Sequence, residues 1–167
     1  MAATDFILSS TDIHALFEYK DGDLFWKVSA GNGRIKPGTR AGVLHSNGYK
    51  SVRIQNVMVK QHRVIFVMFH GRIPFCVDHI DGNPSNNRIE NLREATAAQN
   101  MRNSSKQSRN SSGVKGVYWH KVKQKWIASC CVDNSLKHIG YFEEKQKAVE
   151  AVRAFREEHH GEFANHG

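Results

Sequence analysis

A run of polar residues past the middle of the chain divides it into two small parts. Residues 102–113 read RNSSKQSRNSSG and contain no apolar side chain that a core could bury. Such a segment is typical of a linker. The 167-residue chain is therefore expected to form one unit at 1–103, a linker at 104–113 and a second unit at 114–167. Units of this size bury little apolar surface, so each is expected to depend on local propensity, a metal or a ligand.

The charge of the chain points to a polyanionic partner. The formal net charge is +8, and residues 24–77 contain nine Lys or Arg side chains without a single Asp or Glu. Because a solvated surface normally mixes both signs, this acid-free stretch favours nucleic acid. The sequence has no long apolar run and no signal-like or lipidation pattern at its N-terminus, so we expect no membrane association.

The three cysteines do not form a metal-binding pattern. Cys76, Cys130 and Cys131 include no C-x-x-C pair and have no paired histidines at zinc-finger spacing. Structural zinc is therefore not expected. Adjacent residues of a strand point to opposite faces, so Cys130 and Cys131 are expected to be one core residue and one surface residue rather than a disulfide. This cysteine usage fits a reducing cytoplasm, that of a bacterial host if the chain is phage-encoded.

Short strands and one buried helix are expected in the first unit. Residues 23–29 are predicted to form a strand, and residues 49–54 and 57–59 a hairpin that turns at Gln55-Asn56. Residues 61–70 are apolar nearly all round but too short to span a membrane, which predicts a buried helix.

The second unit has a clearer pattern. Residues 115–120, 125–132 and 136–142 are predicted strands, and residues 143–159 carry apolar side chains at helical spacing. This order predicts a three-stranded antiparallel sheet packed on one C-terminal helix. The fold class of the whole chain is then α+β. A sheet covered on one face leaves its other face open for binding.

Residues 75–95 are predicted to form a second hairpin, followed directly by a helix. Residues 75–80 and 92–95 have strand character, and Asp81-Gly82-Asn83-Pro84 is dense in turn residues. Thr96 and Gln99 then fit a capping box that begins a helix. Two strands and a helix in this order can gather Asp78, His79 and Asn100 at one point.

These three side chains suit phosphodiester hydrolysis. The Asp78 carboxylate and the Asn100 amide are hard oxygen ligands, which favour Mg²⁺ or Mn²⁺ with water and phosphate in the remaining positions. His79 lies on the opposite face of the strand, and an imidazole can take a proton from water near neutral pH. Together they supply the parts of a one-metal hydrolytic site.

The spacing Asp78-His79, Asn91, Asn100 resembles the HNH (ββα-metal) nuclease motif in the variant of phage and intron-encoded homing endonucleases. The resemblance covers residues 15–103, with a core motif at 61–103, and includes these flanking segments: Gly48-Tyr49, His62-Arg63, Asp81-Gly82-Asn83, Asn86-Asn87-Arg88, Asn91-Leu92-Arg93 and Gln99-Asn100. It implies Asp78 and Asn100 as metal ligands, His79 as general base, and Asn91 as the residue that fixes the loop and helps to orient the base. Since Asp78 and Asn100 stand where the motif name has histidines, Mg²⁺ or Mn²⁺ is favoured over zinc.

Each part of this set has a simpler interpretation when taken alone. An isolated Asp-His pair is typical of a turn or a surface ion pair, and Asn-rich segments are commonly loops. The complete spaced set favours the nuclease. His62 is interpreted as a packed helix residue and is not assigned to the site.

Strand alternation separates the two faces of the C-terminal sheet. Trp126, Ala128, Cys130 and Val132 are expected to pack on the helix, which leaves the alternate residues of that strand on the open face. The segment 106–142 has seven Lys or Arg side chains and one acid, Asp133. A basic sheet can enter the major groove of DNA.

The same unit resembles the AP-two domain of plant ethylene-response factors over residues 113–164. The resemblance is carried by GVKGVYW at 113–119, KWIA at 125–128, HIGYF at 138–142 and GEFA at 161–164. Family positions and the lysines of the first turn together predict these DNA-binding residues: Lys115, Tyr118, His120, Lys121, Lys123, Lys125, Ser129, Cys131 and His138. Trp126 is expected in the core, and for Trp119 packing is favoured over stacking on sugar.

The leading hypothesis is a metal-dependent endonuclease that nicks or cleaves double-stranded DNA. The alternative is a DNA-binding regulatory protein with an inactive nuclease centre. RNA binding is a weaker third hypothesis, because the aromatic signatures of single-strand binders are absent. No small-molecule cofactor is expected, and the sequence leaves the target site and the choice between monomer and dimer open.

Overall fold

The computed structural model describes residues 9–103, 110–133 and 135–166. The chain divides into two compact units, Met1–Ala95 and Thr96–Gly167. This division falls earlier than the predicted boundary after residue 103, because the helix at 97–103 packs on a 3-10 turn near the C-terminus. Residues 104–109 of the predicted linker lie outside the described residues.

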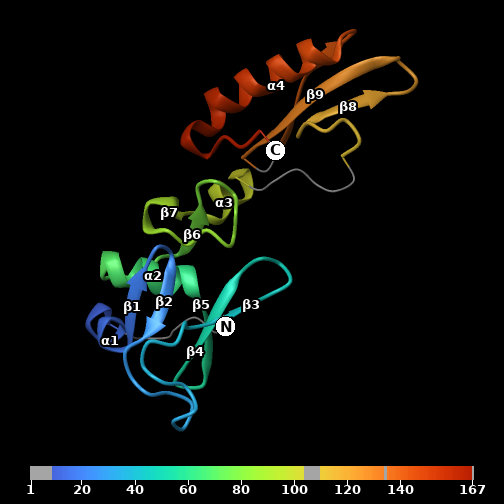
Figure 1. The fold of residues 1–167 in the computed structure, drawn as a ribbon. Helices are drawn as coiled ribbons and strands as arrows, with labels where there is room; N and C mark the ends of the chain where they lie inside the picture. Colours follow the sequence, from blue (N-terminus) through green and yellow to red (C-terminus); the bar gives the residue numbers. More distant parts are fainter. Residues whose placement is uncertain (1–8, 104–109, 134, 167) are drawn as a thin grey trace. The chain divides into compact units, whose positions relative to one another are not determined.

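The first unit begins with a short helix and a strand hairpin (Figure 1). Helix α1 (Ser10–Leu16) starts at a capping box, which the sequence analysis did not predict. Strands β1 (Phe17–Lys20) and β2 (Asp23–Trp26) pair antiparallel around a tight turn at Gly22, whose φ is 86°. The predicted strand at 23–29 is thus confirmed for its first four residues.

A small antiparallel sheet follows in the order β3-β4-β5. Its strands are β3 (Val43–Leu44), β4 (Lys50–Ile54) and β5 (Val57–Lys60). Gln55 and Asn56 connect the last two with φ values of 46° and 65°, as a tight two-residue hairpin turn requires. The predicted hairpin is confirmed.

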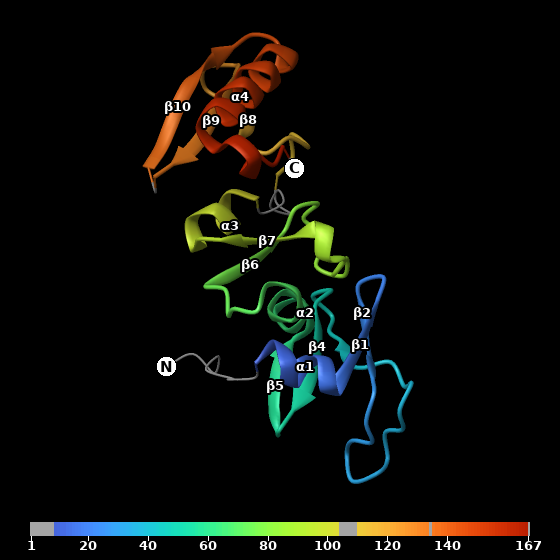
Figure 2. The same ribbon diagram turned by 90° about the vertical axis from the view of Figure 1, so that its left-hand side faces the viewer.

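Helix α2 (Gln61–His70) lies at the centre of the first unit and has the predicted bounds. It contacts α1, β4, β5, β6 and β7, so almost every side of it is covered (Figure 2). Its C-terminus is closed by Gly71 in the left-handed conformation, with φ of 68°. The core around it contains Ile13, Phe17, Leu24, Trp26, Val52, Ile54, Val64, Ile65, Phe66, Val77 and Leu92.

The second predicted hairpin closes the first unit. Strands β6 (Cys76–His79) and β7 (Leu92–Ala95) pair antiparallel, and a 3-10 turn, η1 (Ile89–Asn91), leads into β7. Twelve residues therefore separate the two strands, which leaves a long loop over the end of β6.

The second unit opens with helix α3 (Ala97–Asn103). The predicted capping box is confirmed: Gln99 N–H donates to Thr96 Oγ1 at 3.2 Å, and Thr96 N–H donates to Gln99 Oε1 at 2.7 Å. Helix α3 packs on η2 (Gly161–Phe163), where the Asn165 amide donates to the backbone oxygen of Asn103 at 2.6 Å.

Three strands and one helix make up the rest of the second unit (Figure 1). Strands β8 (Val117–His120), β9 (Lys125–Val132) and β10 (Ser135–Phe142) form an antiparallel sheet in the order β10-β9-β8, and α4 (Lys145–His160) covers one face. This is the predicted arrangement of sheet and helix. The core joins Val117, Ala128 and Cys130 of the sheet to Ala148, Val149 and Val152 of α4.

The cysteines follow the predicted alternation. Cys130 is buried in the core of the second unit, Cys131 is exposed on the other face of β9, and Cys76 is half-buried in β6. All three are free. In the described part of the chain, no helix has the length and apolar character needed to cross a membrane.

Candidate active site and sheet surface

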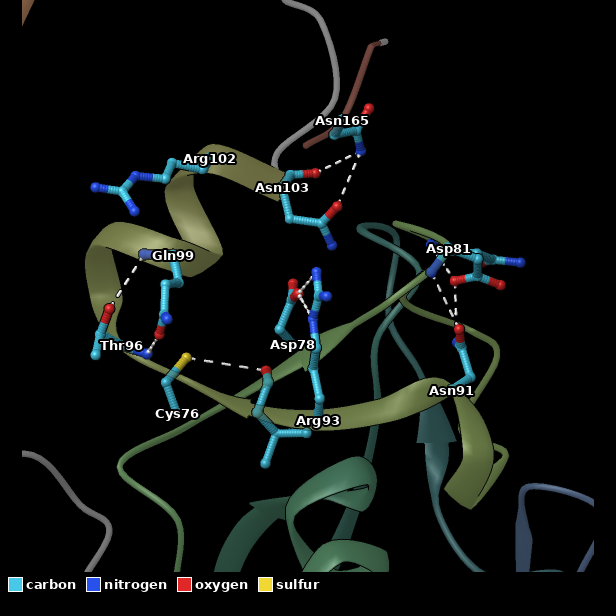
Figure 3. A network of polar contacts seen from close by, with 12 residues as sticks. Cys76, Asp78, Asp81, Asn91, Arg93, Thr96, Gln99, Arg102, Asn103 and Asn165 are labelled. Carbon is cyan, nitrogen blue, oxygen red and sulfur yellow. Dashed lines mark hydrogen bonds and ion pairs between the residues drawn. The ribbon is translucent and has the colours of Figure 1, made fainter. Parts of the chain in front are cut away.

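Asp78 is held at the end of the β6–β7 hairpin by an arginine of the neighbouring strand. Asp78 and Arg93 are register partners, and Arg93 Nε donates to Asp78 Oδ2 at 2.9 Å (Figure 3). Arg93 Nη2 lies 2.9 Å from the same oxygen. Only 3% of Asp78 is exposed, and a carboxylate is tolerated at such burial because it is paired.

The ring of His79 packs against the rings of His62 and Tyr49, and we call these three rings the ring cluster. The His62 and His79 rings meet edge to face, with centroids 5.0 Å apart and planes at 85°. The centroid of the Tyr49 ring lies 5.5 Å from that of His62 and 5.9 Å from that of His79. His79 is 6% exposed, so these contacts restrict the orientation of its ring.

The two neighbours of His79 in the ring cluster are uncharged at neutral pH. Burial lowers the pKa of His62 to about 3, with smaller contributions from His79, Lys60 and Arg63. Burial also raises the pKa of Tyr49, which keeps its hydroxyl protonated. A proton accepted by His79 would therefore meet no second positive charge on the rings that touch it.

Asn91 fixes the long loop that follows β6. Its Oδ1 accepts the Asp81 backbone N–H at 3.0 Å, and its Nδ2 donates to Asp81 Oδ1 at 2.9 Å and to the Asn86 backbone oxygen at 2.8 Å (Figure 3). We call residues 81–88 the Asp81 loop. These hydrogen bonds connect Asn91 to the loop, and the role expected for Asn91 in the site stays a prediction.

Asp81 is the acceptor around which this loop is organised. Burial would raise the pKa of Asp81, but hydrogen bonds from the Asn86 side chain, the Asn83 backbone and the Asn91 side chain outweigh it and hold the pKa below its usual value. The Asp81 carboxylate thus accepts hydrogen bonds from three different residues. Such a network orders a loop that has no strand or helix of its own.

Two glycines, Gly48 and Gly22, lie in close contact with the two ends of the Asp81 loop. A Cβ on Gly48 would lie 2.8 Å from Pro84 Cγ, and Ser85 Oγ donates to the Gly48 backbone oxygen at 2.8 Å. A Cβ on Gly22 would lie 2.8 Å from the Arg88 backbone nitrogen. Because backbone or ring atoms occupy both places, a side chain at either glycine would displace the loop.

The donors near Asp78 suit a hard divalent cation. Asp78 offers carboxylate oxygen, a ligand type that prefers Mg²⁺ or Mn²⁺ to zinc. Burial raises the pKa of the neighbouring Cys76 thiol, against the opposing effect of Arg63. The described residues contain no group of three or more His, Cys, Asp or Glu side chains placed to hold a metal. Asn100 belongs to the second unit, so its pairing with Asp78 stays a prediction.

Three residues around His79 were not assigned from the sequence. Asn87 is 1% exposed and its Oδ1 lies 2.9 Å from His79 Nε2. His62 and Tyr49 complete the ring cluster. All three occur in the segments that carry the HNH resemblance, which was the available signal, but their contact with His79 joins three separate elements and no local pattern predicts it.

The open face of the second unit's sheet carries aromatic and basic side chains. Tyr118, Ile127 and Tyr141 are register partners in one row across the sheet, and the two tyrosines are 45% and 41% exposed. His138 packs on Tyr141 with ring centroids 4.6 Å apart, and Lys123 Nζ lies 3.9 Å above the Tyr141 ring. Tyr141 was not among the predicted DNA-binding residues.

The other predicted DNA-binding residues differ in their exposure to solvent. Lys121 and Cys131 are exposed, and His120 and Lys125 are half-buried partners in the β8–β9 register. Ser129 is only 6% exposed.

Lys115 is engaged inside the second unit. Its Nζ donates to the Arg102 backbone oxygen at 2.8 Å, and burial together with Arg156 lowers its pKa to about 8. Because a lysine ammonium group has three N–H donors, this hydrogen bond leaves donors for a phosphate contact.

The tryptophans of the second unit pack on each other. Trp119 and Trp126 meet edge to face with centroids 5.2 Å apart. Trp126 is half-buried against the core, and Trp119 is 44% exposed. Packing, which was favoured for Trp119, is observed.

Comparison with known proteins finds a protein family whose model matches part of this chain. Residues 59–102 match the family model described as HNH endonuclease. This segment contains α2, the β6–β7 hairpin, the Asp81 loop and most of α3.

Two viral proteins are similar to a larger part of the chain. Protein 3.8 of Escherichia phage T7 is 32% identical over 107 residues, which cover 63% of this chain and 88% of that protein. An uncharacterized HNH endonuclease of Acanthamoeba polyphaga mimivirus is 37% identical over 107 residues, but this chain spans only 54% of its length. No solved structure matches the chain. The chain therefore belongs to the family of phage T7 Protein 3.8, and its residues 59–102 form an HNH endonuclease domain.

Proposed function

We propose that this protein is a metal-dependent endonuclease of the homing type that hydrolyses phosphodiester bonds of double-stranded DNA. The observation that carries the proposal is the position of His79. Its buried ring is held by Asn87 and the ring cluster, directly beside the paired carboxylate of Asp78, inside the segment that matches the HNH endonuclease family.

His79 acts as the general base. An imidazole that accepts a proton from the attacking water raises the nucleophilicity of that water at the moment of attack. His62 and Tyr49 exclude solvent from one side of the ring, and neither of them carries a charge that would oppose protonation. Asn91 holds the Asp81 loop, and with it the end of β6, in place.

Asp78 and Asn100 would hold one Mg²⁺ or Mn²⁺ ion. When bound, such an ion offers a Lewis acid that stabilises charge on phosphate oxygen and on the leaving oxygen. Arg93 fixes the Asp78 carboxylate through Oδ2 and balances its charge within the hairpin.

The sheet of the second unit is proposed to hold the DNA. Lys121, Lys123 and Lys125 would contact phosphates, while Tyr118, His120 and His138 would lie against base edges. The likeness of residues 113–164 to the AP-two domain and the exposed row of Tyr118 and Tyr141 support this division of roles. The proposal is compatible with action in a bacterial cytoplasm, and with either a monomer or a dimer.

A plasmid assay tests the proposed activity. The full chain is incubated with supercoiled plasmid and Mg²⁺ or Mn²⁺, with and without excess EDTA, beside Asp78→Ala and the control Glu158→Ala on α4, whose side chain is 77% exposed. We expect nicked or linear product from the wild type and Glu158→Ala only, and none in EDTA. Cutting that persists in EDTA contradicts the metal-dependent mechanism. DNA binding without any cutting would instead support a DNA-binding regulatory protein with an inactive centre.

A further inference from the structure

The hydrogen bond between the His79 ring and Asn87 determines more than the position of the ring. Its Nε2 lies 2.9 Å from Oδ1 of Asn87, and both residues are buried. An amide oxygen can only accept a hydrogen bond. With the Asn87 amide oriented in this way, the contact is a hydrogen bond when Nε2 carries the ring proton, which in a neutral imidazole leaves the other nitrogen, Nδ1, as the basic one.

We propose that Asn87 is the positioning residue of His79: its side-chain oxygen keeps the ring proton on Nε2 and makes Nδ1 the nitrogen that accepts the proton of the attacking water. This inference rests on the proposed function, since it assigns the reactive atom of the general base. Asn87 acts only through His79 and touches no reacting atom.

The burial of Asn87 supports such a role. The residue is 1% exposed, and its Nδ2 has no hydrogen-bond partner among the described residues. Burying an amide costs solvation free energy. The Asn87 side chain is nevertheless placed inside the unit with its oxygen as the acceptor at the edge of the His79 ring.

The backbone of Asn87 is fixed independently of His79. The neighbouring Asn86 side chain donates to Asp81 Oδ2 at 2.7 Å, and the Asn86 backbone oxygen accepts from Asn91. On the other side, a Cβ on Gly22 would lie 3.0 Å from the Asn87 carbonyl carbon. A backbone held from both sides gives the Asn87 oxygen a defined place beside the ring.

The ring cluster and Asn87 therefore have separate tasks. His62 and Tyr49 fix the plane of the His79 ring by packing, because their contacts are with the ring face and edge. Packing does not distinguish the two tautomers of an imidazole. The hydrogen bond to Asn87 Oδ1 does, since with the amide in its observed orientation only the Nε2–H form makes it.

The test is the tautomer of His79 in the full chain, read from histidine-selective ¹⁵N NMR spectra at a pH where the ring is neutral. The proposal predicts the Nε2–H form in the wild type. It predicts the same form in Asn87→Asp, which retains an acceptor, and a loss of that preference in Asn87→Ala. Asn83→Ala is the matched control, because it removes a hydrogen bond of the loop, from the Ser85 backbone N–H to Asn83 Oδ1, without touching His79 or the hydrogen bonds of Asn86.

Cleavage kinetics provide the second measurement. In Asn87→Ala, kcat should fall about 10- to 100-fold, as for loss of other partners that orient a functional histidine, while KM changes little. Asn87→Asp should recover most of that loss, and Asn83→Ala should leave the His79 tautomer unchanged.

The possible outcomes separate the two proposals. An Nδ1–H tautomer in the wild type, or an unchanged tautomer in Asn87→Ala, overturns the role of Asn87 whether or not the protein cuts DNA. If the wild type shows the Nε2–H form but no metal-dependent cutting, the hydrogen-bond assignment holds and the proposed nuclease function fails. If Asn87→Ala does not fold, the wild-type and Asn87→Asp spectra still decide the tautomer.

Discussion

The candidate active site of the first unit and the open sheet face of the second unit use polar residues in opposite ways. Asp78, His79 and Asn87 are 3%, 6% and 1% exposed, and each lies in a network of specific contacts. Tyr118 and Tyr141 of the sheet are 45% and 41% exposed. The side chains proposed for the chemical step are thus fixed by packing and hydrogen bonds, whereas those proposed for DNA binding are exposed and can adapt to a ligand.

If this contrast is correct, substitutions in the two regions should separate by what they change. Those at the buried site should alter the rate of cutting and the stability of the first unit. Those on the sheet should alter DNA affinity and its dependence on salt.

The largest expected effect is at His79. His79→Ala should lower the cutting rate by a factor of about 10² to 10⁴, the usual contribution of general acid–base catalysis, with little change in DNA binding. Single-turnover plasmid cutting and a gel-shift titration measure the two quantities on the same preparation. A variant that cuts at nearly the wild-type rate would remove His79 from the role of base.

The second-largest effect is expected at Gly22, whose turn lies in close contact with the Asp81 loop. Gly22→Ala should destabilise the first unit by about 1–3 kcal/mol through overpacking and should also slow cutting, because the backbone of Asn87 and Arg88 must move. Gly33→Ala is the matched control: its φ is similar, 82° against 86°, but no other atom lies within 4 Å of the place that a Cβ would take. Urea unfolding of both variants measures the two losses. Equal losses would mean that backbone strain, rather than contact with the loop, explains the effect.

A smaller effect is the dependence of stability on pH through His62. The pKa of His62 in the folded state, about 3, lies below the ordinary value of 6.5. The contribution of His62 to the free energy of unfolding is therefore complete above about pH 6.5 and is lost as the pH falls toward 3. The slope should reach about 1.4 kcal/mol per pH unit within that window. His62→Gln should reduce the slope, whereas His45→Gln, at an exposed position, should not. Urea unfolding followed by NMR signals of α2 at several pH values measures this, and identical slopes would contradict it.

The smallest effect is expected on the sheet. Lys123→Ala should reduce the slope of log affinity against log salt by about one unit, with an unchanged cutting rate at saturating DNA. Lys147→Ala on α4 is the control, because that lysine is exposed on the helix rather than on the open face. A gel-shift salt titration measures both slopes. A change in the slope for Lys147→Ala but not for Lys123→Ala would place the DNA on the helix side.

Regular elements with strong local signals were predictable from the sequence. The bounds of α2 and β9, the turn at Gln55-Asn56 and the capping box at Thr96 agree with the structure, because continuous burial, alternation and capping are encoded by neighbouring residues. The elements α1, β1 and β3 were missed. They are short and become stable only through packing on α2 or pairing with the next strand, which a local pattern does not register.

The sequence by itself determined the chemical composition of the site: a carboxylate followed by a histidine, and asparagines at the spacing of the HNH motif. The tertiary structure decided which groups surround that histidine. His62 from α2, Tyr49 before β4 and Asn87 from the Asp81 loop meet at His79 only because β6 packs on α2 and the glycine turns hold the loop. The physical reason is that hydrogen-bond direction and burial depend on contacts between residues far apart in the chain, whereas residue type and spacing do not.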